Sequence, residues 1–203
     1  SAWKKEQIYS LDEKRKAYQN QTGDIRRGVG MALFSYKTGV WPISLEIAGA
    51  RLSLNQDGSV QLQVGATEIG QGADTVFSQM AAETLHMDIS RVHIVTQQDT
   101  DVTPFDTGAY ASRQSFVTGT AVKECAQQLK QKILEYARTL VPGNVDRLEL
   151  EDGYILADGK PAISLEDLAM ESYYSLSNSS VLTAEVSRQV KKNTVASGCC
   201  LRK

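Results

Sequence analysis

Two spacings of apolar residues divide the 203-residue chain into expected helices and strands. The most regular helical stripe runs from Ala121 to Leu140, and the Pro142-Gly143 pair just after it is typical of a helix end. Alternating or short continuous apolar runs predict the strands. The expected helices are 1–20, 73–87, 121–140 and 165–172, and the expected strands are 29–36, 44–54, 59–64, 92–95, 147–151, 154–157 and 181–186.

The order of these elements predicts an α+β fold in two layers, a mixed β-sheet with helices packed on it. We expect three parts: an N-terminal helix over residues 1–24, a larger α+β lobe over 25–145, and a second small α+β portion over 146–203. Residues 193–203 look like the start of a further strand that stops, so we expect the last portion to be truncated at its C-terminus.

Charge and hydropathy argue against several classes of protein. The net charge of −2 is unlike that of nucleic-acid-binding surfaces, which concentrate positive charge. No apolar run approaches the roughly 18 residues of a membrane helix, and the polar first residues lack the apolar centre of a signal peptide. We therefore expect a cytoplasmic protein that binds neither nucleic acid nor a membrane.

The sequence also argues against a metal held by protein ligands alone. Its three cysteines and two histidines show none of the spacings of zinc or iron–sulfur sites. Cys125 falls within the apolar stripe of the helix expected over 121–140, so we expect it in the core. A metal that works here would have to be brought by a cofactor.

Residues 65–75 form the first of two loops that lead into expected helices. Glycines on either side of Gln71 allow a ligand to approach the backbone closely, and the Gln71 amide can both donate and accept hydrogen bonds. The helix start after the loop presents unpaired N–H groups that suit a phosphate. The alternative is an ordinary glycine turn in which Asp74 or Thr75 caps the helix.

Residues 99–115 form the second loop, which is long and polar. Its acidic residues lack the glycine and the closing glutamate of a calcium loop. Small residues at 107–112 allow close backbone approach, and Arg113 adds a positive charge near a helix start. The alternative is a long surface connection, although loops of this length are usually functional or disordered.

Other motifs do not add a site. The segment Gly28-Val29-Gly30 lacks the third glycine of a dinucleotide fingerprint, and the chain has no Walker loop and no nucleophile elbow. Carboxylates such as Glu46 and Glu68 have no spacing that would bring them together. Composition and spacing alone therefore indicate an α+β domain with a candidate anion-binding loop.

Two long motifs resemble a known family. The stretch GATEIGQGAD at 65–74 resembles the second Gly-Gln-Gly segment in the molybdenum-binding large subunits of the xanthine dehydrogenase and aldehyde oxidase family. The stretch DTDVTPFDTGAYASRQSFVTGTAVKECA at 99–126 is similar to the loop and helix that follow there. The order of the motifs and their spacing of about forty residues also match, so the chain resembles an internal piece of such a subunit.

The resemblance implies a cofactor, a reaction and partners. The cofactor is molybdopterin, in bacteria often as a dinucleotide such as the cytosine form, and the fold is that of a molybdopterin-binding domain. The reaction is hydroxylation of a purine, another heteroaromatic or an aldehyde with water as the oxygen source. Electrons leave through iron–sulfur clusters and FAD on other domains or subunits of an oligomeric enzyme. None of those further groups is expected on this chain.

The resemblance also implies which residues bind the cofactor. By position they are Gly70, Gln71, Gly72, Ala73, Thr75, Tyr110, Ala111, Ser112, Arg113 and Gln114. The backbone of Ala111 matches the position beside the molybdenum. The general-base glutamate would lie beyond Lys203, and the first Gly-Gln-Gly segment before Ser1. We therefore expect this chain alone to be inactive.

Two rival functions stay open, a non-catalytic interaction module and a simple phosphate- or nucleotide-binding domain. The cofactor hypothesis makes geometric predictions. Gln71 and Ala111 should lie close together across a shared concave surface, and the helices after both loops should begin there. Arg113 should be partly exposed at that surface and have no buried carboxylate partner.

Overall fold

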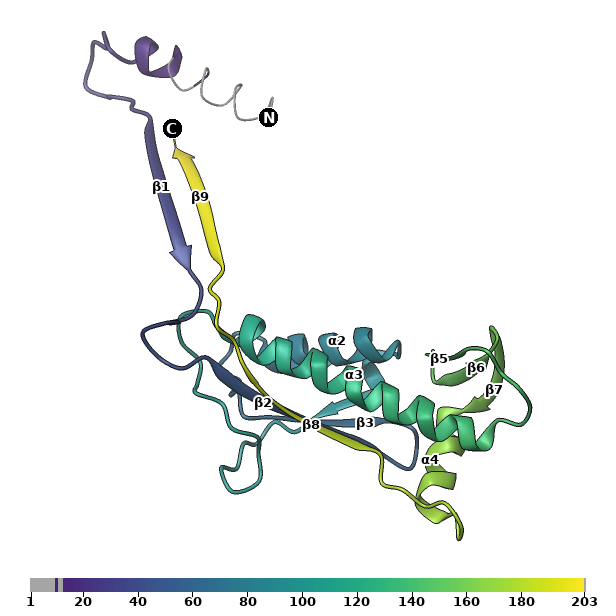
Figure 1. The fold of residues 1–203 in the computed structure, drawn as a ribbon. Helices are drawn as coiled ribbons and strands as arrows, with labels where there is room; N and C mark the ends of the chain where they lie inside the picture. Colours follow the sequence, from purple (N-terminus) through teal and green to yellow (C-terminus); the bar gives the residue numbers. More distant parts are fainter. Residues whose placement is uncertain (1–9, 11–12, 203) are drawn as a thin grey trace. The chain divides into compact units, whose positions relative to one another are not determined.

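A computed structural model describes residue 10 and residues 13–202 (Figure 1). Contacts group the described chain into two compact units. The larger unit is 39–193, and the smaller combines the described residues up to Thr38 with those from Thr194 on. Part of the helix expected over 1–20 lies outside the described residues. In the described part, residues 13–17 are helical.

The sheet of the larger unit has four strands, in the order β4-β3-β2-β8. Their bounds are β2 Ile47–Leu54, β3 Val60–Val64, β4 Val92–Ile94 and β8 Thr183–Gln189. β2 pairs antiparallel with both β3 and β8, whereas β3 and β4 are parallel. Parallel neighbours need a crossover, which helix α2 (Ala73–Leu85) provides. The mixed sheet predicted from the sequence is therefore confirmed.

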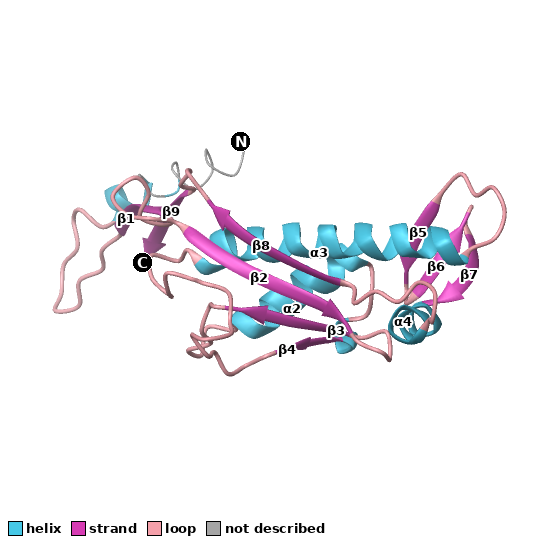
Figure 2. Cartoon of the chain, turned by 60° about the horizontal axis from the view of Figure 1, so that its bottom comes forward, coloured by secondary structure: helices cyan, strands magenta, loops and turns pink. Residues whose placement is uncertain are grey.

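Helices α2 and α3 (Gln114–Leu140) cover one face of this sheet, so the predicted two layers are also confirmed (Figures 1 and 2). Alternate residues of β2, among them Leu52 and Leu54, are fully buried, whereas Arg51 and Ser53 between them are half-buried. The apolar stripe of α3 is buried as expected, and Cys125 lies within it. No helix of the described chain is long and apolar enough to cross a membrane.

A second, three-stranded sheet follows α3. It consists of β5 (Leu148–Glu151), β6 (Tyr154–Ala157) and β7 (Lys160–Ser164), and leads into α4 (Leu165–Tyr174). The hairpin and the helix confirm the sequence prediction, but β7 was not predicted. This strand contains Pro161, which cannot donate to a ladder and is tolerated here because β7 is an edge strand.

The contacts do not follow the boundaries expected at 24/25 and 145/146. β8, which lies in the expected last portion, pairs with β2 in the expected middle lobe and completes its sheet. In the smaller unit, β1 (Gly30–Lys37) pairs antiparallel with β9 (Val195–Arg202). Long-range strand pairing of this kind leaves no trace in local composition, so a linear division of the chain misses it.

Candidate functional site

The two candidate loops touch directly. The Gln71 amide donates to the Gln114 Oε1 atom at 2.6 Å across 43 residues of sequence, and the Gln114 amide donates to the Thr67 carbonyl at 3.2 Å. Gly65 allows this approach, because a Cβ there would lie 2.1 Å from the Pro104 carbonyl oxygen. The expectation that the two loops lie together is therefore confirmed.

Both helices begin beside this contact, as expected. α2 starts directly after Gly72, which has a φ of 82°, and Gln114 is the first residue of α3. Neither Asp74 nor Thr75 caps α2, because its N-cap residue is Gly72 and no side chain caps from that position. The alternative of a conventionally capped glycine turn is therefore not what the structure shows.

The carboxylate of Glu68 occupies N–H groups at the start of α2 that a phosphate would use. Its Oε1 accepts from Gly70 N at 2.6 Å and from Gly72 N at 3.1 Å, and its Oε2 accepts from Asp74 N at 3.1 Å. These bonds, led by that from Gly72, hold the pKa of Glu68 below its ordinary value. The Glu68 carboxylate thus lies where the sequence predicted the phosphate of a ligand.

Arg113 corrects the sequence prediction most clearly. Its side chain is fully buried, and two buried carboxylates bind it: Nε donates to Glu46 Oε2 at 2.6 Å and a terminal nitrogen donates to Asp106 Oδ1 at 2.5 Å. It also donates to the carbonyls of Gly108 at 2.9 Å and Ile47 at 2.7 Å. These bonds use four of the five N–H donors of the guanidinium, so the expectation of an exposed, unpaired Arg113 was wrong.

Burial opposes the charge of Arg113, but its bonds to Glu46 and Asp106 outweigh that effect and raise its pKa further. The carboxylates are compensated from other sides as well. Thr118 donates its hydroxyl to Asp106 Oδ2 at 2.6 Å, and Val40 N donates to Glu46 Oε1. Sequence reasoning missed both carboxylates. Glu46 lies 67 residues from Arg113, so this pair has no local signature. Asp106 lies only seven residues from Arg113, but nothing in the spacing shows that the loop folds back to join them.

The backbone beside Arg113 takes an unusual form. φ is 48° at Ala111 and 52° at Ser112, so two consecutive residues with side chains lie in the left-handed region. The Ala111 carbonyl accepts from Gly39 N at 2.8 Å, which places the segment containing Val40 next to the second loop. Tyr110 is 37% exposed, its hydroxyl donates to Thr107 at 3.0 Å, and its ring lies 5.4 Å from the Arg113 guanidinium carbon.

The ten predicted cofactor-binding residues differ in their access to solvent. Three of them are buried and belong to the packing beneath the loops: Ala73, Arg113 and Gln114. Two are half-buried, Gly72 and Ala111. The exposed ones are Gly70, Gln71, Thr75, Tyr110 and Ser112. Within the described chain, no group of three or more His, Cys, Asp or Glu side chains is placed to hold a metal ion.

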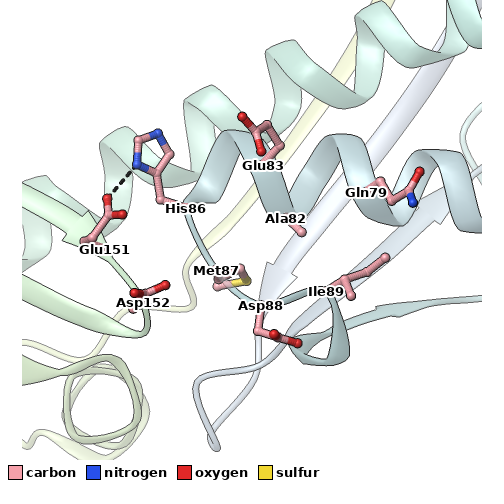
Figure 3. Close-up of a pocket in the computed structure, with 9 residues that line it drawn as sticks. All are labelled: Gln79, Ala82, Glu83, His86, Met87, Asp88, Ile89, Glu151 and Asp152. Carbon is pink, nitrogen blue, oxygen red and sulfur yellow. Dashed lines mark hydrogen bonds and ion pairs between the residues drawn. The ribbon is translucent and has the colours of Figure 1, made fainter.

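A cavity of about 680 Å³ lies at the other end of α2 (Figure 3). Its polar lining includes His86, whose Nδ1 atom lies 2.7 Å from Glu151, and Asp152 on the β5–β6 turn. Its lining on α2 begins at Gln79, in the middle of the helix, and includes no residue of either loop. The cavity therefore does not belong to the site formed by the two loops.

Comparison with known proteins agrees with the two motifs. The model of the family described as molybdopterin cofactor-binding domain matches residues 4–200. The chain is 48% identical over 195 residues to the putative xanthine dehydrogenase molybdenum-binding subunit XdhA of Escherichia coli K12, and 34% identical over 149 residues to the probable hypoxanthine oxidase XdhD of that strain. These matches cover 95% and 73% of the chain, but 26% and 15% of the two relatives.

Solved structures show the same fold at lower identity. The CO dehydrogenase of Oligotropha carboxidovorans matches with a TM-score of 0.78 at 22% identity, over 98% of this chain and 27% of that one. Quinoline 2-oxidoreductase from Pseudomonas putida 86 matches with a TM-score of 0.73 at 20% identity, over 98% of this chain and 26% of that one. Taken with the family match over nearly the whole chain, the chain belongs to the molybdopterin cofactor-binding domain family.

Proposed function

We propose that this chain forms part of the cofactor-binding wall of a molybdenum hydroxylase of the xanthine dehydrogenase and aldehyde oxidase type. The observation that carries the proposal is the hydrogen bond between Gln71 and Gln114, which joins the two motif-bearing loops into one surface. The chain spans about a quarter of the curated relative XdhA, at 26% of its length, so the reaction belongs to a larger parent protein.

The exposed side of the two loops fits a ligand that approaches the backbone. Nothing lies within 4 Å of the positions where side chains would stand on Gly70 and Gly72. Asp74 Oδ1 is buried with no hydrogen-bond partner, and burial followed by repulsion from Glu68 raises its pKa. A donor group of a bound pterin would satisfy this oxygen, so Asp74 joins the candidates that sequence reasoning missed.

Each exposed residue has a stated part in this proposal. The Gln71 amide nitrogen already donates to Gln114 at 2.6 Å and to the Thr67 carbonyl at 3.0 Å, and its Oε1 accepts from Ile69 N at 2.7 Å. Gln71 would therefore accept from the cofactor through the remaining lone pair of Oε1, on the turn between the two open glycines. Tyr110 and Ser112 would line the cofactor on the second loop, with the Ala111 backbone beside the metal. Thr75 would contribute its hydroxyl from the first turn of α2. When bound, the cofactor supplies the metal centre that exchanges oxygen and electrons, while this chain orients it.

The relatives' names support a proposal for the substrate of the whole enzyme. Xanthine dehydrogenase and hypoxanthine oxidase act on purines, and a 30% identical relative is a subunit of the 6-hydroxypseudooxynicotine dehydrogenase complex of Paenarthrobacter nicotinovorans. We therefore propose a purine, another heteroaromatic or an aldehyde as the substrate. Iron–sulfur and FAD domains or subunits would accept the electrons, in a cytoplasmic oligomer.

The test compares Gln71→Ala with Gln131→Ala in the full-length parent. Gln131 is an exposed amide on α3 that donates only to the nearby Glu135 at 2.8 Å, so it controls for the loss of an amide. Loss of one hydrogen bond, worth about 0.5–1.5 kcal/mol, should weaken cofactor binding roughly two- to thirteen-fold. Molybdenum and pterin per chain, measured at limiting cofactor, should fall for Gln71→Ala alone. Equal content and turnover in both variants would contradict the proposal.

A further inference from the structure

The left-handed pair Ala111-Ser112 needs support from outside its own loop. A Cβ at a φ near 50° crowds the following carbonyl, so residues other than glycine adopt this region as isolated exceptions. Such a conformation persists only where the surroundings over-determine it. What surrounds this pair is the buried charge cluster of Arg113, Glu46 and Asp106.

The contacts around the pair form a closed ring. Gly39 N donates to the Ala111 carbonyl, and the next residue, Val40, donates its N–H to Glu46 Oε1. Glu46 Oε2 accepts from the Arg113 Nε atom, and Arg113 lies two residues after Ala111. Gly39 fits tightly in this ring, because a Cβ there would lie 2.8 Å from Glu46 Oε1. A shift of Glu46 therefore moves both the donor to Ala111 and the anchor of Arg113.

The same cluster reaches the first loop through Gln114. This residue follows Arg113 directly, is 8% exposed, and accepts from the Gln71 amide at 2.6 Å. Asp106 anchors the other end of the loop, since its Oδ1 also accepts from Gly108 N at 2.8 Å. Both ends of the 106–113 segment are thus fixed by one guanidinium.

Stability alone is a weak reason for such a cluster. Burying three ionic groups costs the hydration free energy of each. Well-packed apolar residues of similar volume often give a folded state that is equally stable or more stable. What the cluster provides, and apolar packing would not, is a directional set of bonds that defines one backbone path. This argument favours a role in geometry.

We propose that Glu46 and Asp106, acting through Arg113, are positioning residues that fix the Ala111–Ser112 backbone and the Gln71 side chain in their ligand-binding form. The ligand concerned is the cofactor, and in that respect the inference rests on the proposed function. Neither carboxylate touches the cofactor; both act through Arg113.

The first experiment measures amide hydrogen exchange on the 203-residue chain and does not depend on the cofactor. Glu46→Gln leaves one side-chain oxygen where the carboxylate uses two, one to accept from Val40 N and one to accept from Arg113 Nε. The substitution therefore breaks one bond of the ring. Glu185→Gln is the matched control, because it neutralises the half-exposed partner of Arg51 on the outer face of the sheet. We expect exchange at Gly39, Val40 and Arg113 to become at least ten-fold faster in Glu46→Gln only, while the amide of Leu129 in α3 keeps its rate.

Two outcomes of that experiment would overturn the proposal. Native exchange at the loop amides of Glu46→Gln would show that the ring does not hold them. Equal acceleration at Leu129 would show a general loss of stability. If Glu46→Gln does not fold, Asp106→Asn takes its place, and native loop exchange in that variant has the same consequence.

The second experiment uses the full-length parent and the same variants. Glu46→Gln should lower kcat per bound molybdenum at least ten-fold and alter the electron paramagnetic resonance line shape of the reduced metal, while Glu185→Gln matches the unmodified enzyme. Unchanged rate and line shape in Glu46→Gln would overturn the positioning role. A parent that carries no molybdopterin would refute the proposed function instead. The exchange experiment would still decide whether the ring of contacts holds the loop.

Discussion

Gly65→Ala tests how tightly the two loops are packed. The new Cβ would stand 2.1 Å from the Pro104 carbonyl oxygen and 2.9 Å from Asp106 N, and both obstacles are backbone atoms that cannot rotate away. The substitution must therefore move the 104–106 segment, on which Asp106 holds Arg113. Overpacking of this kind costs about 1–3 kcal/mol, so the free energy of unfolding should fall by that amount.

The matched control is Gly28→Ala. Nothing lies within 4 Å of the Cβ position at Gly28, and its φ is not in the left-handed region, so alanine fits without strain. There the change should leave stability the same or raise it by up to about 1 kcal/mol, because alanine restricts the unfolded chain.

Both variants are measured by urea unfolding and by a thermal scan. For a domain of this size, 1 kcal/mol corresponds to about 2–4 °C in Tm, so Gly65→Ala should melt roughly 2–12 °C lower. NMR shifts should move at residues 104–106 and at the Arg113 side chain. A Gly65→Ala chain as stable as the unmodified chain, with those shifts unchanged, would refute the packing described between the loops.

Three further outcomes are expected. Because folding lowers the pKa of Glu68, its ionised carboxylate stabilises the folded chain at pH values above its unfolded pKa, near 4.5, and this stabilisation is lost as the pH falls through the lower folded pKa. The difference in unfolding free energy between the unmodified chain and Glu68→Gln should therefore disappear in acid. Urea unfolding at stepped pH measures it. Burial raises the pKa of the Cys125 thiol to about 11, so a thiol reagent should label Cys199 and Cys200 quickly and Cys125 only after unfolding, as mass spectrometry would show. Leu129→Ala empties a fully buried position of α3 and should cost about 2–5 kcal/mol by urea unfolding, and a loss below 1 kcal/mol would contradict its place in the core.

The elements predicted correctly are those whose apolar residues recur at a regular local spacing. The stripe of α3 and the alternation in β3 predicted their elements because burial of one face repeats every 3.6 or every two residues. β7 was missed because Pro161 within it reads as a strand breaker, and its edge position, which makes the proline harmless, depends on a neighbouring strand.

The candidate site was predicted in its location but not in its electrostatics. Motif order and spacing correctly placed Gln71 beside the second loop. The expectation that Arg113 is free failed for two reasons. Glu46, just before β2, meets it only after the second loop has packed against that strand, and Asp106 meets it only when the second loop folds back on itself. Glu68 was likewise passed over, although it lies only two residues before the glycine whose N–H it accepts.

These two failures have one physical cause. A loop built from glycines and left-handed residues does not adopt one conformation by itself. A ligand that had to order the loop would bind more weakly, because the lost conformational entropy counts against the binding free energy. The fold therefore uses the strongest available groups, the Glu68 carboxylate and the Arg113 guanidinium, to fix the loops internally. Under the proposed function, recognition would be left to neutral groups, chiefly the Gln71 side-chain oxygen and the hydroxyls of Tyr110 and Ser112. In a loop of this kind, the charged residue that most resembles a ligand contact in the sequence is the one that the structure needs for its own shape.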